Sequence, residues 1–452
     1  MQVLWGLAGM AFLLLLAFAM SENRRSVRWR TVLGALALQV LFGAAVLDWE
    51  LGKAALSAVS AGVQKVVDTS NEGIDFLVGP LIPPKNSGKT VFAFQVLPLI
   101  VFIASLSAVL YHWNVLQWVV RVLGGGLRRV LGTSQAESLN ATANIFLGQT
   151  EAPLVVRPYL AAMTRSEFFA VMVGGLATVA GSVMVGYAML GARLDHLIAA
   201  SFMAAPAGLL MAKIVMPETE TAAPDRGRRG ADADSSGEQA EGPDETSSEG
   251  SSSEGSGSEE SGPEGSGSAE RGVDDAEAVE TKPRNVIDAA ATGATDGLKL
   301  ALNVAAMLFA FISLIGLVNL LLSTAGGFVG LPGLTFQQIL GWIFAPLMVV
   351  IGVPWHEAVA AGGLVGEKLA INEFLAFTDF SAVAATFSEK TRVMVTFALT
   401  GFANFSSLAI LLGGLGGLVP KRRPMIAQYG LRAVLAATLA NLLSATIAGM
   451  LT

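Results

Sequence analysis

The sequence predicts an all-α polytopic membrane protein with eight transmembrane helices, an interfacial helix, and two re-entrant hairpins of opposite orientation that form an inverted repeat. Composition is the first reason: 53% of the 452 residues are hydrophobic and only 14% are charged, against roughly 25% charged in an average soluble domain. The second reason is that uncharged apolar stretches recur along the chain, long enough to cross the ~30 Å hydrocarbon core as helices. The third is a repeated order of charged and broken apolar segments.

Uncharged apolar stretches mark the eight candidate spans. The first lacks the cleavage pattern of a signal peptide and is interpreted as a true span. The spans are expected at residues 1–20, 31–47, 90–113, 168–192, 196–212, 301–323, 393–418 and 433–452.

Basic residues near the span ends predict the orientation, because loops rich in Lys and Arg stay in the cytoplasm. Three basic clusters fall on one side if the N-terminus lies outside. The C-terminus is then also outside, and the segment after the fifth span is cytoplasmic. The clusters are Arg24, Arg25, Arg28 and Arg30; Arg121, Arg128 and Arg129; and Lys421, Arg422, Arg423 and Arg432.

Residues 217–285 are expected to form a disordered acidic linker. Residues 218–282 hold 19 acidic and 5 basic side chains, which gives this segment a charge of −14. The rest of the chain carries +7, so the net charge of the whole chain is −7. Their Gly, Ser and Glu composition buries too little apolar surface to offset the entropy of ordering. The segment is either a solvated spacer or a docking site for a partner.

The segment from Asp48 to Lys89 has mixed charge and a helical apolar pattern. This pattern predicts a helix lying at the outer membrane interface. Its apolar positions are Leu56, Val59, Val63 and Val66.

Residues 134–164 and 336–385 fit neither a span nor a loop, because they are apolar yet carry charges. Charges and irregular backbone are tolerated at membrane depth only inside protein or against a wet cavity, so both regions are interpreted as re-entrant hairpins. Each precedes a span interrupted by small residues, at "GGLATVAGS" and "TGFANFSS". This repeated order indicates a secondary transporter with its site at the midplane, although pairs of short packed helices remain an alternative. The charges are Glu151, Arg157, Glu357, Glu367, Lys368, Glu373 and Asp379.

The strongest local group of polar residues is Gln149, Thr150 and Glu151, in "NIFLGQTEAPLVVRPYL". Gly148 permits a tight turn before them and Pro153 removes a backbone donor after them. An amide, a hydroxyl and a carboxylate in succession provide donors and acceptors for a polar heterocycle. An ion pair between Glu151 and Arg157 is the structural alternative.

A second group lies in "GFANFSS", where Asn404 and Ser407 share a helix face and Phe402 offers an aromatic edge. Gly181 and Ser182 form a third group, in "AGS". Helix packing and backbone hydrogen bonds are the alternative explanations for both groups.

An intramembrane enzyme is not expected. The chain contains no cysteine and only three scattered histidines, His112, His196 and His356, and no nucleophile with a base or metal ligands is evident. A passive channel shares many of these features and stays open, since accumulation against a gradient is what separates it from a transporter.

These motifs resemble the concentrative nucleoside transporter family. The resemblance rests on "GQTEAPL", "PYLAAMTRSE", "ATVAGSV", "GVPWHEA", "EKLAINEF" and "GFANFSSLAILLGGLGGLVPKRR", which follow in order over nearly the whole chain apart from the linker. It implies a homotrimer with interfacial helices, in which a mobile transport domain moves against a fixed scaffold. It further implies uptake of nucleosides such as uridine or adenosine, by symport with sodium, across the cytoplasmic inner membrane.

The resemblance also implies roles for individual residues. Contacts to the nucleobase are expected from Gln149, Thr150 and Glu151. Contacts to the ribose hydroxyls are expected from Glu357, Asn404 and Ser407, and Phe402 is expected to line the pocket. The sodium site is expected to include the side chains of Asn144 and Ser182 and the backbone carbonyls of Leu147, Ser182 and Val183. Proton coupling is the alternative, and His356 beside Glu357 is a possible source of pH sensitivity.

The resemblance implies five parts of the chain. The scaffold comprises 1–113 and 286–335, the transport halves comprise 114–216 and 336–452, and 217–285 is the cytoplasmic linker. Apart from the coupling ion no cofactor is expected, and the expected partners are nucleosides, membrane lipid and further copies of the chain, but no nucleic acid. The preference for purine or pyrimidine nucleosides stays open.

Overall fold

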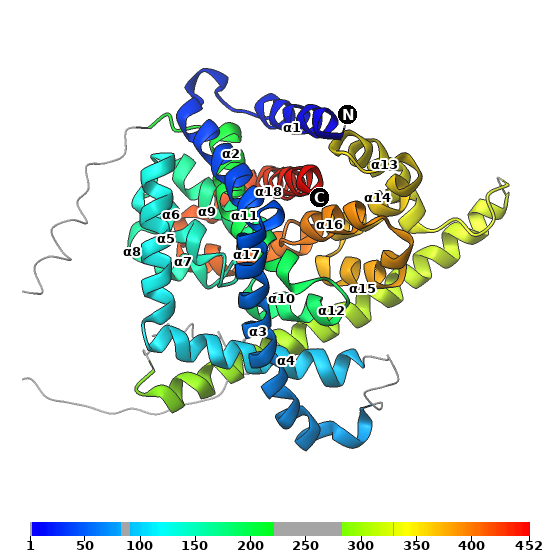
Figure 1. Ribbon diagram of the computed structural model, residues 1–452, viewed down its shortest axis with the longest axis horizontal. Coiled ribbons are helices and arrows are strands. Elements are labelled where there is room, and N and C mark those ends of the chain that lie inside the picture. The colour runs from blue at the N-terminus through cyan, green and yellow to red at the C-terminus, as the bar shows by residue number, and fades with distance from the viewer. Residues whose placement is uncertain (1, 83–90, 221–282, 329) are drawn as a thin grey trace, which may run out of the picture. The chain divides into compact units, whose positions relative to one another are not determined.

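The computed structural model describes residues 2–82, 91–220, 283–328 and 330–452, and these residues form helices with no strand among them. Residues 221–282, on which most of the predicted acidic linker falls, lie outside the described part. Figure 1 shows how the helices pack around a central group that includes α11 and α18.

Five helices precede the first predicted hairpin. They are α1 (Gln2–Ala19), α2 (Trp29–Gly43), α3 (Glu50–Val78), α4 (Phe92–His112) and α5 (Val115–Leu131).

The helix predicted within Asp48–Lys89 is present as α3, and one of its faces is buried in the protein. Val59 and Val66 are exposed, whereas Val67, Ser70 and Ile74 are buried. The face is set by where α4 packs against α3, which local periodicity does not reveal.

The first half of the repeat contains hairpin 1, which consists of the short helices within residues 134–164, and a broken span. Ser134 with Glu137, and Thr164 with Glu167, form capping boxes that satisfy the first backbone N–H groups of α6 and α9. The helices are α6 (Gln135–Ala143), α7 (Ala152–Val155), α8 (Arg157–Leu160), α9 (Arg165–Ala177), α10 (Gly181–Met189) and α11 (Leu194–Val215).

The second half contains a long helix, hairpin 2, a second broken span and the final span. The helices are α12 (Val286–Phe328), α13 (Phe336–Ile351), α14 (Trp355–Ala370), α15 (Glu373–Val383), α16 (Glu389–Leu399), α17 (Phe405–Leu418) and α18 (Arg423–Leu451).

Hairpin 2 consists of α13 and α14, which bend by 118° relative to each other. Gly352 makes this turn possible because it ends α13 with φ at 114°, a conformation that L side chains rarely adopt. Pro354 then occupies the N-cap position of α14. The predicted hairpin extended to residue 385, but its second arm ends at Ala370 and α15 follows as a separate helix.

Six helical segments in the described residues are long and apolar enough to span a membrane, or seven if the bent pair counts as one span. They overlap six of the eight predicted spans. The first predicted span is a shorter apolar helix, α1, and the seventh is divided by a break between α16 and α17. The chain is thus an all-α polytopic membrane protein.

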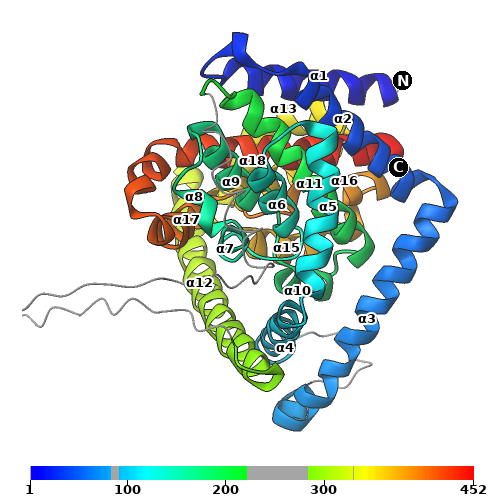
Figure 2. The ribbon, with the colours of Figure 1, turned by 90° about the vertical axis from the view of Figure 1, so that its left-hand side faces the viewer.

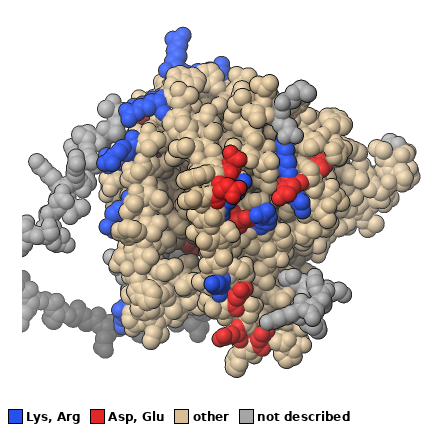
Figure 3. Space-filling model, viewed as in Figure 1, with Lys and Arg blue, Asp and Glu red and all other residues tan. Residues whose placement is uncertain are grey.

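Burial separates inner helices from outer ones. In the most apolar stretch of α11, 94% of residues are buried, against 11% in α12. Figure 2 shows α12 running along the outside with α4 beside it, a pair that packs extensively. On the face that Figure 3 shows, charged side chains gather in a few patches among uncharged residues.

Candidate functional site

The two helix breaks meet inside the protein. The α9–α10 break comprises residues 178–180 and the α16–α17 break comprises residues 400–404. The backbone N–H of Phe402 donates to the carbonyl of Thr178 at 3.1 Å. Gly401, with φ at 140°, allows this approach, because a Cβ there would lie 2.6 Å from the carbonyl oxygen of Ala177. Both interrupted spans of the inverted repeat are therefore joined at their irregular backbone.

Lys368 on α14 ties the ends of two half-helices together. Its buried Nζ donates to the carbonyl of Ala398 at 2.7 Å and to Oδ1 of Asn441 at 2.8 Å. The amide of Asn441 in turn donates to the carbonyl of Ala177 at 2.7 Å. Ala177 and Ala398 lie in the last turns of α9 and α16, so the ammonium contacts the negative end of α16 directly and is linked to that of α9 through Asn441.

The tip of hairpin 1 packs against both broken spans. The N–H of Gly181, at the start of α10, donates to the carbonyl of Phe146 at 3.0 Å. Gln149 lies against α9, since a Cβ on Gly175 would be 3.0 Å from its Cβ. Thr150 lies against α17, within 2.7 Å of where a Cβ on Gly414 would stand. The structure thus brings the predicted tip residues to the two helix breaks.

Three side-chain amide oxygens of hairpin 1 are buried and accept no hydrogen bond from the described residues. They belong to Asn140, Asn144 and Gln149. Buried polar atoms without a partner are rare and call for an explanation. Oxygen ligands from side chains and irregular backbone suit a hard cation, and Asn144, for which the sequence predicts a role as a cation ligand, is one of the three residues.

Thr178 is a candidate oxygen ligand of the cation that the sequence analysis did not single out. It follows the last residue of α9 and its hydroxyl donates to the carbonyl of Gly174 at 2.8 Å. Gly174 faces the Asn144 amide, with 3.6 Å between Nδ2 and an added Cβ. Leu147 and Val183, predicted as carbonyl ligands, are buried, and Ser182 lies in the first turn of α10.

Glu373 connects the two broken spans through side chains. One carboxylate oxygen accepts from the hydroxyl of Tyr187 on α10 at 2.9 Å, and the other accepts from Nδ2 of Asn404 at 2.7 Å. Asn404 caps α17, and its Oδ1 accepts from the N–H of Ser407 at 2.7 Å. Glu373 appeared in the sequence only as one of several charges at membrane depth, without a role.

The structure does not bring Glu357 to this group. Its two oxygens accept from the N–H and the hydroxyl of Ser388, at 2.7 and 2.9 Å, and Ser388 is the N-cap of α16. His356 is exposed and lies 3.6 Å from Glu357. Among the described residues Glu151 forms no ion pair with Arg157; its N–H donates to the carbonyl of Gly148.

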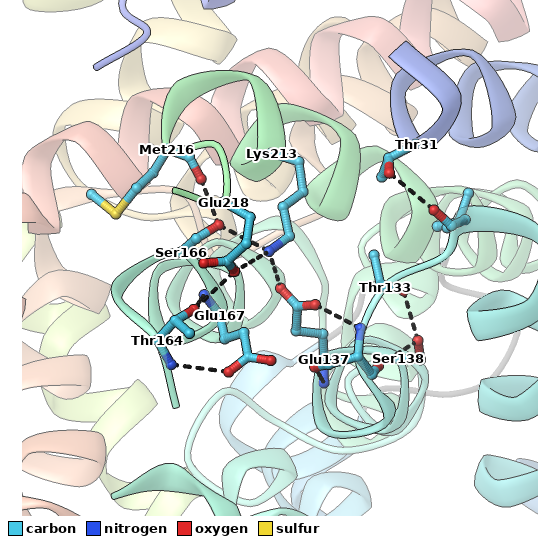
Figure 4. A network of polar contacts seen from close by, with 12 residues as sticks. Thr31, Thr133, Glu137, Ser138, Thr164, Ser166, Glu167, Lys213, Met216 and Glu218 are labelled. Atoms are coloured by element: carbon cyan, nitrogen blue, oxygen red, sulfur yellow. Dashed lines mark hydrogen bonds and ion pairs between the residues drawn. The ribbon is translucent and has the colours of Figure 1, made fainter. Parts of the chain in front are cut away.

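The base of hairpin 1 is anchored by a buried ion cluster, shown in Figure 4. Lys213 on α11 pairs with Glu137 on α6 and donates to the hydroxyl of Ser166 on α9 at 2.9 Å. Glu218 lies 3.7 Å from the same ammonium and accepts from Thr164 at 2.8 Å. Three elements that are distant in sequence are thus held at one end of the hairpin.

Comparison with known families covers most of the chain. Residues 8–81 match the model of the "Na+ dependent nucleoside transporter N-terminus", residues 196–449 that of its C-terminus, and residues 93–194 that of "Nucleoside recognition".

Two bacterial relatives match this chain over nearly the whole length of both proteins. The chain is 48% identical to an uncharacterised transporter of Bacillus subtilis over 100% of both chains, and 42% identical to a nucleoside permease of Helicobacter pylori over 99% and 97%. It is 35% identical to sodium/nucleoside cotransporter 1 of Rattus norvegicus, matching 98% of this chain and 63% of the relative.

Solved structures of a similar protein match this chain over its whole length. The structure of CNTnw in an inward-facing substrate-bound state is 45% identical and matches with a TM-score of 0.86, over 100% of this chain and 98% of that one. A variant of CNTnw in an outward-facing state matches with a TM-score of 0.85, at 44% identity and over the same shares of the two chains. The motifs, the paired helix breaks and these matches lead to one conclusion: the chain belongs to the concentrative nucleoside transporter family.

Proposed function

We propose that this protein uses a sodium gradient to accumulate nucleosides such as uridine or adenosine in the cell. The observation that carries the proposal is the meeting of two broken spans and a re-entrant tip, where unpaired amide oxygens and a carboxylate lie inside a membrane protein. Broken helices at a repeat interface provide both a cation site and a substrate site. The family to which the chain belongs supports the substrate class.

In this proposal Gln149, Thr150 and Glu151 contact the nucleobase. Amide and carboxylate groups at the hairpin tip can match donors and acceptors on the edge of a base. The unpaired Oε1 of Gln149 supports this role, because it needs a donor.

The ribose hydroxyls are assigned to Glu373, Asn404 and Ser407, with Phe402 lining the pocket. Glu373 replaces Glu357 in this assignment, because its carboxylate contacts Asn404 whereas that of Glu357 is occupied by Ser388. A carboxylate is an acceptor that suits vicinal hydroxyls, and charge-assisted hydrogen bonds are the stronger ones.

Sodium is proposed to bind between Asn144 and the start of α10, with the carbonyls of Leu147, Ser182 and Val183 and the hydroxyl of Ser182. Thr178 is added as a further oxygen ligand, because its hydroxyl bonds the carbonyl of Gly174, the residue that faces the Asn144 amide. A cation here would attach the hairpin tip to the α9–α10 break and so favour the substrate-binding shape of the tip.

The transport halves, 114–216 and 336–452, are proposed to move against a scaffold made of 1–113 and 286–335. The low burial of α12 supports its place in a scaffold that contacts lipid or other subunits of a homotrimer. The N-terminus and C-terminus are proposed to lie outside an inner membrane, with the acidic linker in the cytoplasm.

The test is uptake of radiolabelled uridine and adenosine into proteoliposomes, with sodium and proton gradients imposed separately. We expect accumulation above equilibrium under an inward sodium gradient and its loss when choline replaces sodium. Uptake driven by a proton gradient alone would favour a proton symporter. Equilibration without accumulation under every gradient would favour a passive channel.

A further inference from the structure

Glu367 is a fully buried acid that has no role in the proposed transport site. It lies on α14, and one of its carboxylate oxygens, Oε2, receives no hydrogen bond from the described residues. Its other oxygen accepts from Nε2 of Gln337 at 3.3 Å, and the same Nε2 donates to Asp379 at 3.4 Å. One neutral amide therefore bridges two acids, Glu367 and Asp379.

No cation in the described residues neutralises this pair. No ion pair involves Glu367 or Asp379 there. Lys368, next to Glu367 in the chain, extends to Ala398 and Asn441 instead.

No basic side chain on the elements packed around the pair forms an ion pair with it in the described residues, including Lys390, which lies by Gly352 at the end of α13, and Arg392 on α16. α13 contains no charged residue, and α12 faces this region with the amide of Asn319. On α14 and α15 the remaining acids are Glu357, which is bonded to Ser388, and Glu373, which is bonded to Tyr187 and Asn404.

Glu367 is fully buried and shares its one amide donor with a second carboxylate, and like charges brought together in this way favour protonation of the buried one. Oε2 of Glu367 accepts no hydrogen bond from the described residues, and a proton on this carboxyl removes the unsatisfied charge. We propose that Glu367 and Asp379 form a proton-binding site that holds one shared proton.

The site lies where hairpin 2 meets α12. Asn319 on α12 donates to Oε1 of Gln337 at 3.2 Å, and its own Oδ1 accepts from the N–H of Phe336 at 2.7 Å. A continuous chain of polar groups thus runs from α12 through Gln337 to Glu367 and Asp379. The arms of hairpin 2 pack closely at this place, since a Cβ on Gly363 would lie 2.9 Å from the carbonyl of Gln337.

Loss of the proton places two unpaired negative charges within hairpin 2 and α15. Unpaired charges at membrane depth cost several kcal/mol, and in the proposed mechanism these segments move relative to α12. Transport is therefore expected to require the protonated pair, whichever ion drives accumulation. This consequence rests on the proposed transport function, whereas the proton site itself does not.

The direct test is infrared spectroscopy of the full-length protein in detergent, following the carbonyl band of protonated carboxylic acids from about pH 6 to about pH 9.5. The wild type is expected to show a band that disappears on the alkaline side. Glu367→Gln and Asp379→Asn should each remove that component. Glu357→Gln is the matched control on the same helix and should leave it unchanged, because its carboxylate already accepts two hydrogen bonds from Ser388.

The second readout is sodium-driven uridine uptake with equal pH on both sides of the membrane. Above the pH at which the pair ionises, wild-type uptake should fall by up to about tenfold per pH unit. Uptake by Glu367→Gln should change by no more than about twofold over the same pH range, because its amide can donate to Asp379. A band that persists in both variants would overturn the proposal, and so would a wild type without the band. These infrared outcomes do not depend on transport, so they are distinguishable from a failure of the proposed function.

Discussion

Glu373→Gln is the sharpest test of the assigned ribose site. The carboxylate of Glu373 accepts from Tyr187 on one side and from Asn404 on the other. An amide keeps one acceptor but turns the other into a donor, which then faces the hydroxyl of Tyr187 or the amide of Asn404. The change also removes the negative charge on which charge-assisted hydrogen bonds from ribose hydroxyls depend.

The expected loss follows from the value of a hydrogen bond to a charged group, about 1.5 to 3 kcal/mol. This corresponds to roughly a ten- to 150-fold weaker affinity for uridine. Calorimetric titration of the detergent-solubilised protein with uridine and with 2′,3′-dideoxyuridine measures both the loss and its origin. The dideoxy ligand lacks the ribose hydroxyls, so its affinity should change far less.

Glu357→Gln is the control, because Glu357 contacts Ser388 rather than Asn404. It should leave the ratio of the two affinities unchanged. If Glu357→Gln abolished the preference for ribose hydroxyls and Glu373→Gln did not, the assignment of Glu373 would be refuted and the original assignment from the sequence restored.

The remaining predictions concern stability, ion linkage and the linker. Lys213→Met leaves a buried carboxylate without its cation, so we expect a loss of about 3 to 5 kcal/mol, seen as a lower melting temperature in detergent; an unchanged melting temperature would contradict the structural role of the ion cluster. Gly401→Ala should destabilise by more than about 2 kcal/mol, because the added Cβ would lie 2.6 Å from a carbonyl oxygen; a well-folded variant that binds uridine normally would show that the helix breaks can separate. Asn144→Ala should abolish most of the sodium dependence of uridine affinity, which for typical coupling energies is about five- to 150-fold; weak binding with an unchanged sodium slope would remove Asn144 from the cation site. Replacing residues 222–280 by a short Gly/Ser segment should leave uptake per folded molecule nearly intact, since loop length changes closure entropy only slowly, by about 0.6 kcal/mol per halving; loss of uptake in well-folded protein would indicate regulation by the linker.

Local sequence determined where the membrane-spanning helices of this protein form and where two of them break. Long apolar stretches correspond to α2, α4, α11 and α18 because the bilayer requires about 20 apolar residues for a span. The helix breaks at "ATVAGS" and "GFANFS" were also evident, because small residues and Asn act on the backbone where they stand.

The tertiary structure decided which polar groups meet. Glu357 bonds Ser388 and Glu373 bonds Asn404, and both pairs are separated by 31 residues in the sequence. Spacing therefore does not distinguish a carboxylate that caps a helix from one that joins two broken spans. The same holds for Glu367 and Lys368, which are adjacent in the chain but have entirely different partners. Side-chain partners depend on which helix faces pack together, and that is settled by the whole fold rather than by any local pattern.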